Sequence, residues 1–579
     1  MELPKRVLTR AEIAQRVAQG EVLVLHRRLV YKLDNWIKNH PGGDLAILHF
    51  VGRDAKDEIE AYHSQETITK LMRRFVIAQL ASEDATDLSL GRVYRPLMPP
   101  IQLGYRNGAL DHPDAQLAAW QASEQGKENK ARITHFPLPV SLLEPPPSKL
   151  SLLNEARISQ AYEDMHQKIK DAGLYDLKPR HYARELSRYI SLALLSYFFL
   201  QVAKQNQGYI ATALYLTSAA SLGFMWHQLT FLAHDAGHTS ITHDYATDRL
   251  IGIVVASLFG GLSLVWWCDN HDVHHLVTNH PEHDPDIQHM PIFAISPRFV
   301  SRQASAAAES PKEHASHLQS SEKDSATSVE CHPENSSSLD QPNEENGKMQ
   351  NPPTDIQYGL WSSYYRRVLY FDAFARVLLR FQHKLYFIIM SLARFNLYAL
   401  SYSFLLMRAR RDRWFWMETL GLIGFWTWFA GGVLSSLPSW GMVVGYLLVS
   451  HICASPVHVQ IVLSHFAQDT SDLGPQECFA SRQIRTTMDV QCPSYMDFVH
   501  GGLHMQVTHH LFPRLPRHNL REARDQFVKP FCKEYGLVYE EHKFVRGNNK
   551  VLSQLKDVAD QVSFFCCVAE AQAKGEIHH

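Results

Sequence analysis

Six long apolar runs set the strongest limit on how this chain can fold. They cover residues 186–203, 209–233, 249–267, 385–407, 414–436 and 440–463. A helix needs about 20 apolar residues to cross a bilayer, and several of the runs approach that length. Trp and Tyr near the ends of the runs favour membrane segments over buried helices of a large soluble core. We therefore expect an α-helical multi-pass membrane protein.

Histidine is the second unusual feature, because its 33 copies outnumber the 29 glycines. Three clusters, HDAGH, HDVHH and QVTHH, each lie beyond an apolar run. Spacings of three and four residues put side chains on one helical face, so several imidazoles can point at one centre. This many nitrogens is enough for two metals. The predicted site comprises His234, His238, His271, His274, His275, Gln506, His509 and His510.

Residues 9–80 have the pattern of a small α+β domain. Thr9 and Glu12 form a capping box, which predicts the start of a helix. The apolar runs 21–25 and 28–33 predict two strands. Since MELPKRVLTRAEIAQRV at the N-terminus has no apolar core of a signal peptide, we expect this domain to stay in the cytosol.

The same domain carries a separate pair of histidines. His40 stands in HPGGD, and His63 follows the segment DAKDEIEAY. Two histidines on opposite sides of a pocket can hold both axial positions of a haem iron, which suits electron transfer better than oxygen chemistry. His26 and His49 lack such a setting, and we expect them to be packing or surface residues.

A haem electron donor on the same chain favours a redox metal at the histidine clusters. We predict iron there, because zinc has no redox step that could use an electron. His465 ends an apolar run and is predicted as a further ligand, while Asp235 and Asp272 are predicted to orient the imidazoles. The nearby histidines expected to be supporting or surface residues are His227, His243, His280, His283, His500 and His504.

The clusters must share one side of the membrane, so an even number of spans separates them. We predict two hairpins, 186–203 with 209–233 and 414–436 with 440–463, which give four spans. The other two runs are expected in the interface or the protein interior. The run 385–407 has Arg394 and Asn396 at its middle, which are costly in hydrocarbon. The run 249–267 contains Gly252, Gly260 and Gly261.

Composition separates the remaining parts of the chain. The predicted divisions are 1–80, a connector and pre-membrane region 81–180, a first membrane part 181–298, an insertion 299–356, a second membrane part 357–545 and a tail 546–579. The insertion is polar and should be disordered. The formal charge of −2 gives no basic bias, so we expect no nucleic-acid partner. The 8 cysteines form no CxxC pair and should be reduced thiols.

The motifs of this chain resemble those of two known protein families. Residues 9–80 resemble cytochrome b5, with His40 and His63 on the haem-ligand positions. The three boxes, the last opened by glutamine, resemble membrane fatty-acyl desaturases, and the fusion narrows this to the front-end group. Within that group the chain is most similar to fungal sphingolipid Δ8 desaturases. The long insertion between the second and third boxes departs from the compact family pattern.

The resemblance implies a reaction and its cofactors. Two iron ions would activate O2, and electrons would come from NADH through a cytochrome b5 reductase and haem b. The substrate would be ceramide or a sphingoid base, which gains a trans double bond at carbon 8. The enzyme would lie in the endoplasmic reticulum membrane with both sites facing the cytosol. The implied iron ligands are His234, His238, His271, His274, His275, His465, His509 and His510, with Gln506 replacing a histidine of simpler desaturases.

Three alternatives stay open at this point. A Δ5 or Δ6 acyl-lipid or acyl-CoA desaturase would use the same residues. A sphingolipid fatty-acid hydroxylase can also combine a cytochrome b5 domain with membrane histidine motifs. A haem-binding membrane adaptor without oxidase activity would need none of the clustered histidines.

Overall fold

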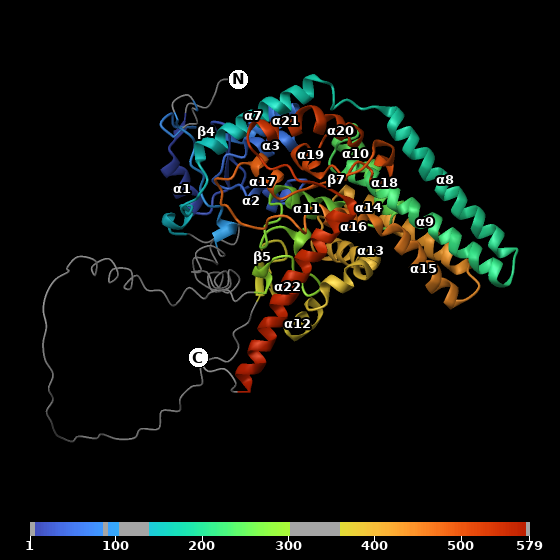
Figure 1. Cartoon of the computed structure of the whole chain (residues 1–579). Helices are drawn as coiled ribbons and strands as arrows, with labels where there is room; N and C mark the ends of the chain where they lie inside the picture. Colours follow the sequence, from blue (N-terminus) through green and yellow to red (C-terminus); the bar gives the residue numbers. More distant parts are fainter. Residues whose placement is uncertain (1–5, 85–87, 89–90, 104–137, 301–358, 575–579) are drawn as a thin grey trace, which may run out of the picture.

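The computed structural model describes residues 6–84, 88, 91–103, 138–300 and 359–574. The insertion predicted to be disordered, 299–356, lies almost entirely outside the described residues. A compact body contains the N-terminal domain, and a group of long helices projects from it (Figure 1). The expected mainly helical membrane fold with an α+β N-terminal domain is confirmed.

The N-terminal domain is built on one four-stranded sheet. Its order is β1-β4-β3-β2, with β1 parallel to β4 and the other pairs antiparallel. The capping box of Thr9 and Glu12 is present at the start of α1. The elements are β1 (Val7–Leu8), α1 (Arg10–Ala18), β2 (Leu23–His26), β3 (Leu29–Lys32), η1 (Ile37–Asn39), α2 (Leu45–Leu48), α3 (Lys56–Tyr62), η2 (Thr67–Leu71), η3 (Met72–Phe75) and β4 (Val76–Leu80).

The N-terminal domain shares its core with the rest of the molecule. Val273, inside the second histidine box, and Val277, two residues after it, are buried in the same apolar cluster as the α1 and β2 side chains. The connector, expected to tether more than it folds, packs closely where it is described. Leu97 and Leu143 are fully buried in that cluster, and the Tyr94 hydroxyl donates to the Gly52 carbonyl (2.9 Å). The apolar residues between the prolines explain this packing.

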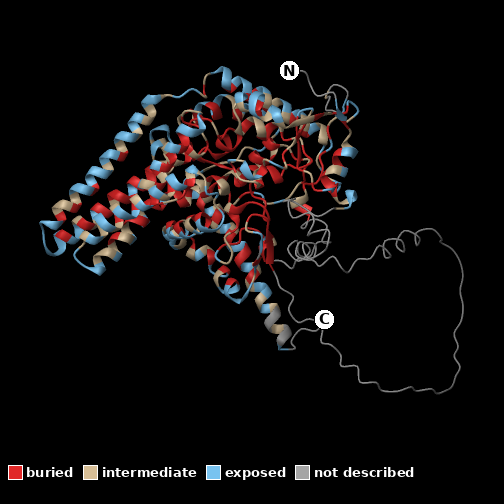
Figure 2. Ribbon diagram, turned by 180° about the vertical axis from the view of Figure 1, so that it is seen from behind, coloured by how far each residue is buried: buried red, intermediate tan, exposed pale blue. Residues whose placement is uncertain are grey.

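A helical arm forms the predicted first hairpin and part of the second. It contains α8 (Pro179–Lys204), α9 (Gly208–Gly237), α15 (Trp440–Ala454) and α16 (Pro456–Leu463). Figures 1 and 2 show these helices side by side, with exposed outer faces. Trp440 is 85% exposed and Leu194 is 62% exposed. Large apolar side chains on an outer face are expected where lipid replaces water.

Among the described residues, three helices are long and apolar enough to cross a membrane: Pro179–Lys204, Gln382–Met407 and Trp440–Leu463. The number rises to four if the bent pair Tyr245–Phe259 and Leu264–Leu276 counts as one span. The first and third coincide with predicted spans. The predicted span 414–436 is instead a helical run in pieces, α14 (Arg413–Trp426), η9 (Thr427–Val433) and η10 (Leu434–Ser436). The four-span count therefore stays a prediction.

Helix α13 (Gln382–Met407), expected at the interface or in the interior, contacts the rest of the protein near each end and at its middle. The Gln382 amide donates to the Ala294 carbonyl (3.2 Å). Arg408, just after the helix, lies 3.7 Å from the carboxylate of Asp269 in the second histidine box region. At the middle, Arg394 is 3% exposed and lies over the ring of Trp226. Because α13 is also one of the candidate spans, its expected placement at the interface or in the interior stays a prediction.

The run 249–267 bends back inside the protein. It forms α10 (Tyr245–Gly252), η6 (Ile253–Phe259) and α11 (Leu264–Leu276), with an angle of 114° between the two halves. Side chains from other helices satisfy the backbone at the bend: Trp428 donates to Leu258, Trp226 to Phe259, Arg394 to Gly260 and Tyr402 to Gly261. Irregular backbone at membrane depth needs such internal partners. The bent pair can be a broken span or a re-entrant segment, so the expected placement at the interface or in the interior stays a prediction.

The remaining elements complete the body around the histidine boxes. The helix α7 (Leu152–Asp171) packs against α3 and α17. The longer or paired elements are β5 (Gly359–Ser362), β6 (Arg367–Tyr370), α12 (Ala373–Leu379), α17 (Phe479–Arg485), β7 (Asp489–Gln491), α18 (Asp497–His500), α19 (Gln506–Leu511), α20 (Leu520–Ala523), η13 (Arg524–Val528), α21 (Lys529–Glu534), β8 (Glu541–Lys543) and α22 (Phe544–Ala573). Short turns are η4 (Pro100–Gln102), η5 (Val140–Leu143), η7 (Pro285–Ile287), η8 (Pro297–Phe299), η11 (Ser494–Met496) and η12 (Arg517–Asn519).

Candidate functional site

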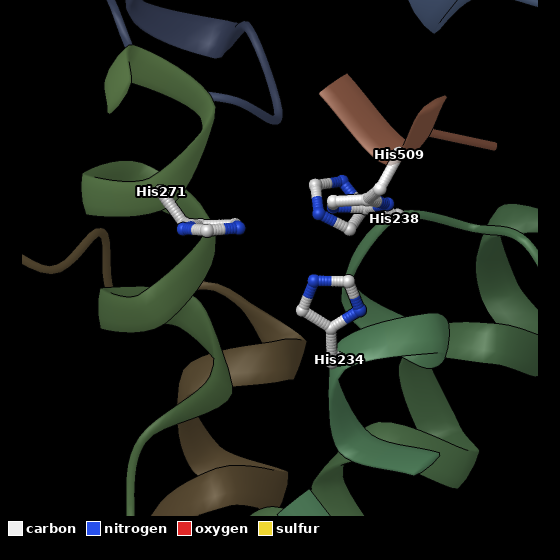
Figure 3. Close-up of side chains that lie close together, drawn as sticks. All are labelled: His234, His238, His271 and His509. Carbon is white, nitrogen blue, oxygen red and sulfur yellow. The ribbon is translucent and has the colours of Figure 1, made fainter. Parts of the chain in front are cut away.

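The clustered histidines come together in two buried groups. The first contains His234, His238, His271 and His509, which converge from α9, α11 and α19 (Figure 3). The second contains His274, His465 and His510. Within each group the candidate ligand nitrogens lie within 4.8 Å of one another. Each group therefore has the shape of a site for one metal ion.

His275 joins the two groups. Its Nε2 lies 3.0 Å from Nε2 of His271 and 3.2 Å from Nε2 of His509, both in the first group. Its ring stacks on that of His510, in the second group, with 4.0 Å between ring centroids. Two adjacent metals would therefore be surrounded by eight imidazoles, including the predicted His465.

Carboxylates and an amide fix the orientation of several of these rings. Nδ1 of His274 donates to Asp284 (2.8 Å), and Nδ1 of His271 donates to Asp286 (3.2 Å). Nδ1 of His510 donates to the Gln483 side-chain oxygen (2.9 Å). A partner on one nitrogen sets the tautomer and leaves the other nitrogen for the metal. The sequence interpretation missed these partners, although DPD in HPEHDPD follows the second box closely.

The two aspartates predicted to orient imidazoles have other contacts. Asp235 forms an ion pair with Arg517 (2.8 Å) and accepts from Tyr182 (2.9 Å), and its carboxylate is 3.8 Å from His234 Nδ1. Asp272 points to Gly42 of the N-terminal domain. Both follow a box histidine directly, and on a helix the next residue is rotated by about 100° away from the metal-facing side. The prediction is therefore wrong for Asp272, whereas Asp235 keeps a 3.8 Å contact with His234 beside its stronger bonds to Arg517 and Tyr182.

Distant carboxylates hold the first turns of two box helices. Glu418 of α14, fully buried, accepts from the backbone N–H groups of Leu264 (2.5 Å) and Val265 (3.1 Å) at the start of α11. Asp489 of β7 accepts from the N–H of Val507 (2.8 Å) at the start of α19. The free N–H groups of a helix start favour such anions. These contacts fix the direction in which each helix presents its histidines.

The donor set fits metal ions. Among the described residues, both ring nitrogens of His238, Nδ1 of His275 and Nε2 of His510 are buried without a hydrogen-bond partner. Buried polar atoms seldom stay unpaired, so these nitrogens are suited to a metal. Burial holds the pKa of His509 and His510 well below its ordinary value, which keeps the rings neutral and able to bind metal. Nitrogen ligands in this number suit iron.

The predicted haem pair is also brought together. The ring centroids of His40 and His63 lie 6.1 Å apart, close to the separation of two imidazoles that bind one metal from opposite sides through bonds of about 2 Å each. Nδ1 of His40 donates to the Gly43 carbonyl (2.9 Å) and Nδ1 of His63 to the Ile59 carbonyl (3.0 Å). Each Nε2 is thus left for iron. Burial lowers the pKa of both, that of His63 to about 4.

The other predicted residues fall outside these two groups. Gln506 is buried at the start of α19, one turn before His509, and its role stays a prediction. A third group contains Cys492, Asp497 and His504, but the Arg521 guanidinium already neutralises Asp497 (2.5 Å). Other histidines not in the two groups are His227, His243, His280, His283 and His500. His26 and His49 are buried packing residues, as expected.

Comparison with known proteins gives two family matches and several full-length relatives. The fatty acid desaturase profile matches residues 211–310 and 346–543, and the cytochrome b5-like heme/steroid binding domain profile matches 9–81. A Delta 8-(E)-sphingolipid desaturase of Emericella nidulans is 37% identical, covering 96% of this chain and 95% of the relative. One of Komagataella phaffii is 38% identical, covering 96% and 94%. Delta(8)-fatty-acid desaturase 1 of Arabidopsis thaliana is 26% identical, covering 97% and 95%.

Proposed function

Because the chain belongs to the fatty acid desaturase family and carries a cytochrome b5-like domain at its N-terminus, we propose that it is a sphingolipid Δ8-(E)-desaturase. Two arrangements of histidines carry the proposal. One is the two adjoining histidine groups, which His275 joins, and the other is the pair of His40 and His63. The first is a site for two redox metals. The second is a site for an electron carrier.

The histidines have distinct roles in this proposal. His40 and His63 hold haem b, and His234, His238, His271, His274, His275, His465, His509 and His510 hold two iron ions. The irons, when bound, supply the oxygen activation needed to remove two hydrogens from an unactivated alkyl chain. Asp284, Asp286 and Gln483 keep the ligand nitrogens aimed at the metals. Gln506 stands at the edge of this shell.

The substrate proposal rests on the relatives. Those from Emericella nidulans and Komagataella phaffii are named for sphingolipids and for the Δ8-(E) position. We infer that this chain places a trans double bond at carbon 8 of the sphingoid base in ceramide. Dioxygen is the oxidant, and NADH supplies electrons through a cytochrome b5 reductase.

The membrane arrangement is part of the proposal. Four spans, two from each hairpin, place both sites on the cytosolic face of the endoplasmic reticulum. His234 and His271 support a common face, because their ring centroids are 5.5 Å apart. With Cys567 replaced, a cysteine at Asn206 or Pro438 is expected to react only from the lumen, and one at Arg410 only from the cytosol. Lumenal labelling at Arg410 would show that α13 crosses the membrane.

Expression in a yeast that lacks Δ8-unsaturated sphingolipids tests the activity itself. Mass spectrometry of long-chain bases and fatty acids should show new bases with a trans double bond at carbon 8. New polyunsaturated acids with unchanged bases would favour a Δ5 or Δ6 acyl desaturase. Hydroxylated acids would favour the hydroxylase alternative. No new lipid, with haem bound, would favour the adaptor.

A further inference from the structure

A contact between the N-terminal domain and α11 lies between the proposed haem ligands, His40 and His63, and the two histidine groups proposed to bind metal. A β-carbon added to Gly42 would lie 2.7 Å from Oδ2 of Asp272 and 3.3 Å from Cε1 of His40. A β-carbon added to Gly43 would lie 2.5 Å from Oδ1 of Asp269. A side chain at either glycine would force the facing carboxylate of α11 to shift. The loop that follows His40 is therefore pressed directly against the helix that carries the second histidine box.

Tyr62 extends this contact to the metal-type groups. It precedes His63 in the chain, and its ring meets that of His275 edge-on, with 6.3 Å between centroids and 84° between planes. Among the described residues its buried hydroxyl has no hydrogen-bond partner. The Tyr62 ring therefore contacts His275, which adjoins both metal groups. The Tyr62 backbone is joined by one peptide bond to His63, a proposed haem ligand. Among the described residues, the other ring contact between the N-terminal domain and the rest of the chain joins His49 to His283, which lies outside the metal groups.

We propose that the Tyr62 ring is the contact through which electrons pass from the haem to the metal pair, and that the Gly42–Gly43 loop on α11 holds it there. The inference rests on the proposed function. In each transfer the ferrous haem iron loses one electron and becomes ferric, and one ferric ion of the histidine site becomes ferrous. No bond breaks. No proton moves at Tyr62, because its hydroxyl has no acceptor in the part of the chain that the structure describes. Two transfers supply the two electrons that NADH contributes to each double bond.

The full-length enzyme with Tyr62→Leu tests this contact, with Tyr62→Phe as its matched variant. Haem content, haem absorbance and midpoint potential are measured first, because they report haem binding without turnover. Oxidation of prereduced haem is then followed by absorbance after mixing with O2 and substrate. We expect Tyr62→Leu to slow this oxidation roughly tenfold or more, as a barrier increase of about 1.4 kcal/mol would, with the potential unchanged. Tyr62→Phe should stay near the wild type.

The outcomes separate this inference from the proposed function. The rate constant is read only from molecules that hold haem, so partial haem loss does not hide the effect. Wild-type oxidation rates in Tyr62→Leu would overturn the proposed contact while leaving desaturation established. Equal slowing in Tyr62→Phe would overturn transfer through the ring without a proton. As a control, Tyr94→Leu removes another buried tyrosine, whose hydroxyl donates to the Gly52 carbonyl of the N-terminal domain, and it should leave the rate unchanged. Absence of product from the wild type would instead refute the proposed function.

Discussion

Replacement of His509 by alanine is expected to abolish desaturation while the haem absorbance stays intact. His509 belongs to the first metal group, and its Nε2 lies 3.2 Å from that of His275, which adjoins the second. Loss of an outer partner of a ligand costs up to about 100-fold in metal affinity or activity, and loss of the ligand itself should cost more. Product is measured by mass spectrometry, iron by elemental analysis and haem by its absorbance.

His542→Ala provides the control, because His542 lies in β8 outside both metal groups. It should keep both iron and product. If His509→Ala formed product at the wild-type rate, the proposed metal site would be wrong. Loss of haem absorbance in the same variant would contradict the separation of the two sites.

The sequence predicted the histidine arrangement because its signals are local. Spacings of three and four residues define one face of a helix, and His234 with His238 and His271 with His275 obey this spacing. His40 and His63 could be paired because a compact domain of known pattern surrounds them. His465 was placed by its position at the end of an apolar run. All of these predictions depended on short stretches of chain.

The partners of the ligands could not be predicted in the same way. Asp235 and Asp272 adjoin box histidines in sequence, but helical rotation turns them toward Arg517 and toward the N-terminal domain. Asp284 comes from a loop that folds back onto α11, ten residues after His274. Which carboxylate returns to the metal site is decided by tertiary packing. Sequence neighbours were therefore a poor guide to spatial neighbours.

Charged residues within the apolar runs were also only partly understood from the sequence. Arg394 was recognised as costly in hydrocarbon, and it does lie inside the protein, with its guanidinium bonded to the Gly260 carbonyl (2.5 Å). Glu418 is likewise an ionisable residue within an apolar run, in the segment WFWMETLGL, but the sequence analysis did not single it out. An ionisable residue within a membrane segment normally has a specific partner. Here that partner is the start of the helix that bears the second histidine box.

Glu418→Ala is therefore expected to disturb the metal site from a distance. Its carboxylate accepts from the Ser263 hydroxyl (2.9 Å) and from the N–H groups of Leu264 and Val265. Each buried donor left without an acceptor costs about 1–3 kcal/mol, so the variant should lose roughly 3–5 kcal/mol of stability. α11 would then hold His271, His274 and His275 loosely. We expect a lower unfolding temperature in detergent, less bound iron and little product.

Two further variants isolate the cause. Glu418→Gln keeps one acceptor oxygen and the side-chain shape, so it should fall between the wild type and alanine in stability and iron content. Thr419→Ala changes the next residue of α14, whose hydroxyl bonds only to the Phe415 carbonyl of its own helix (2.8 Å), and it should retain all three properties. Wild-type iron content and activity in Glu418→Ala would refute the anchoring of α11 by this carboxylate. Because α11 supplies three of the proposed ligands, anchoring by Glu418 would make a residue of α14, far from the histidine boxes in sequence, a determinant of iron binding.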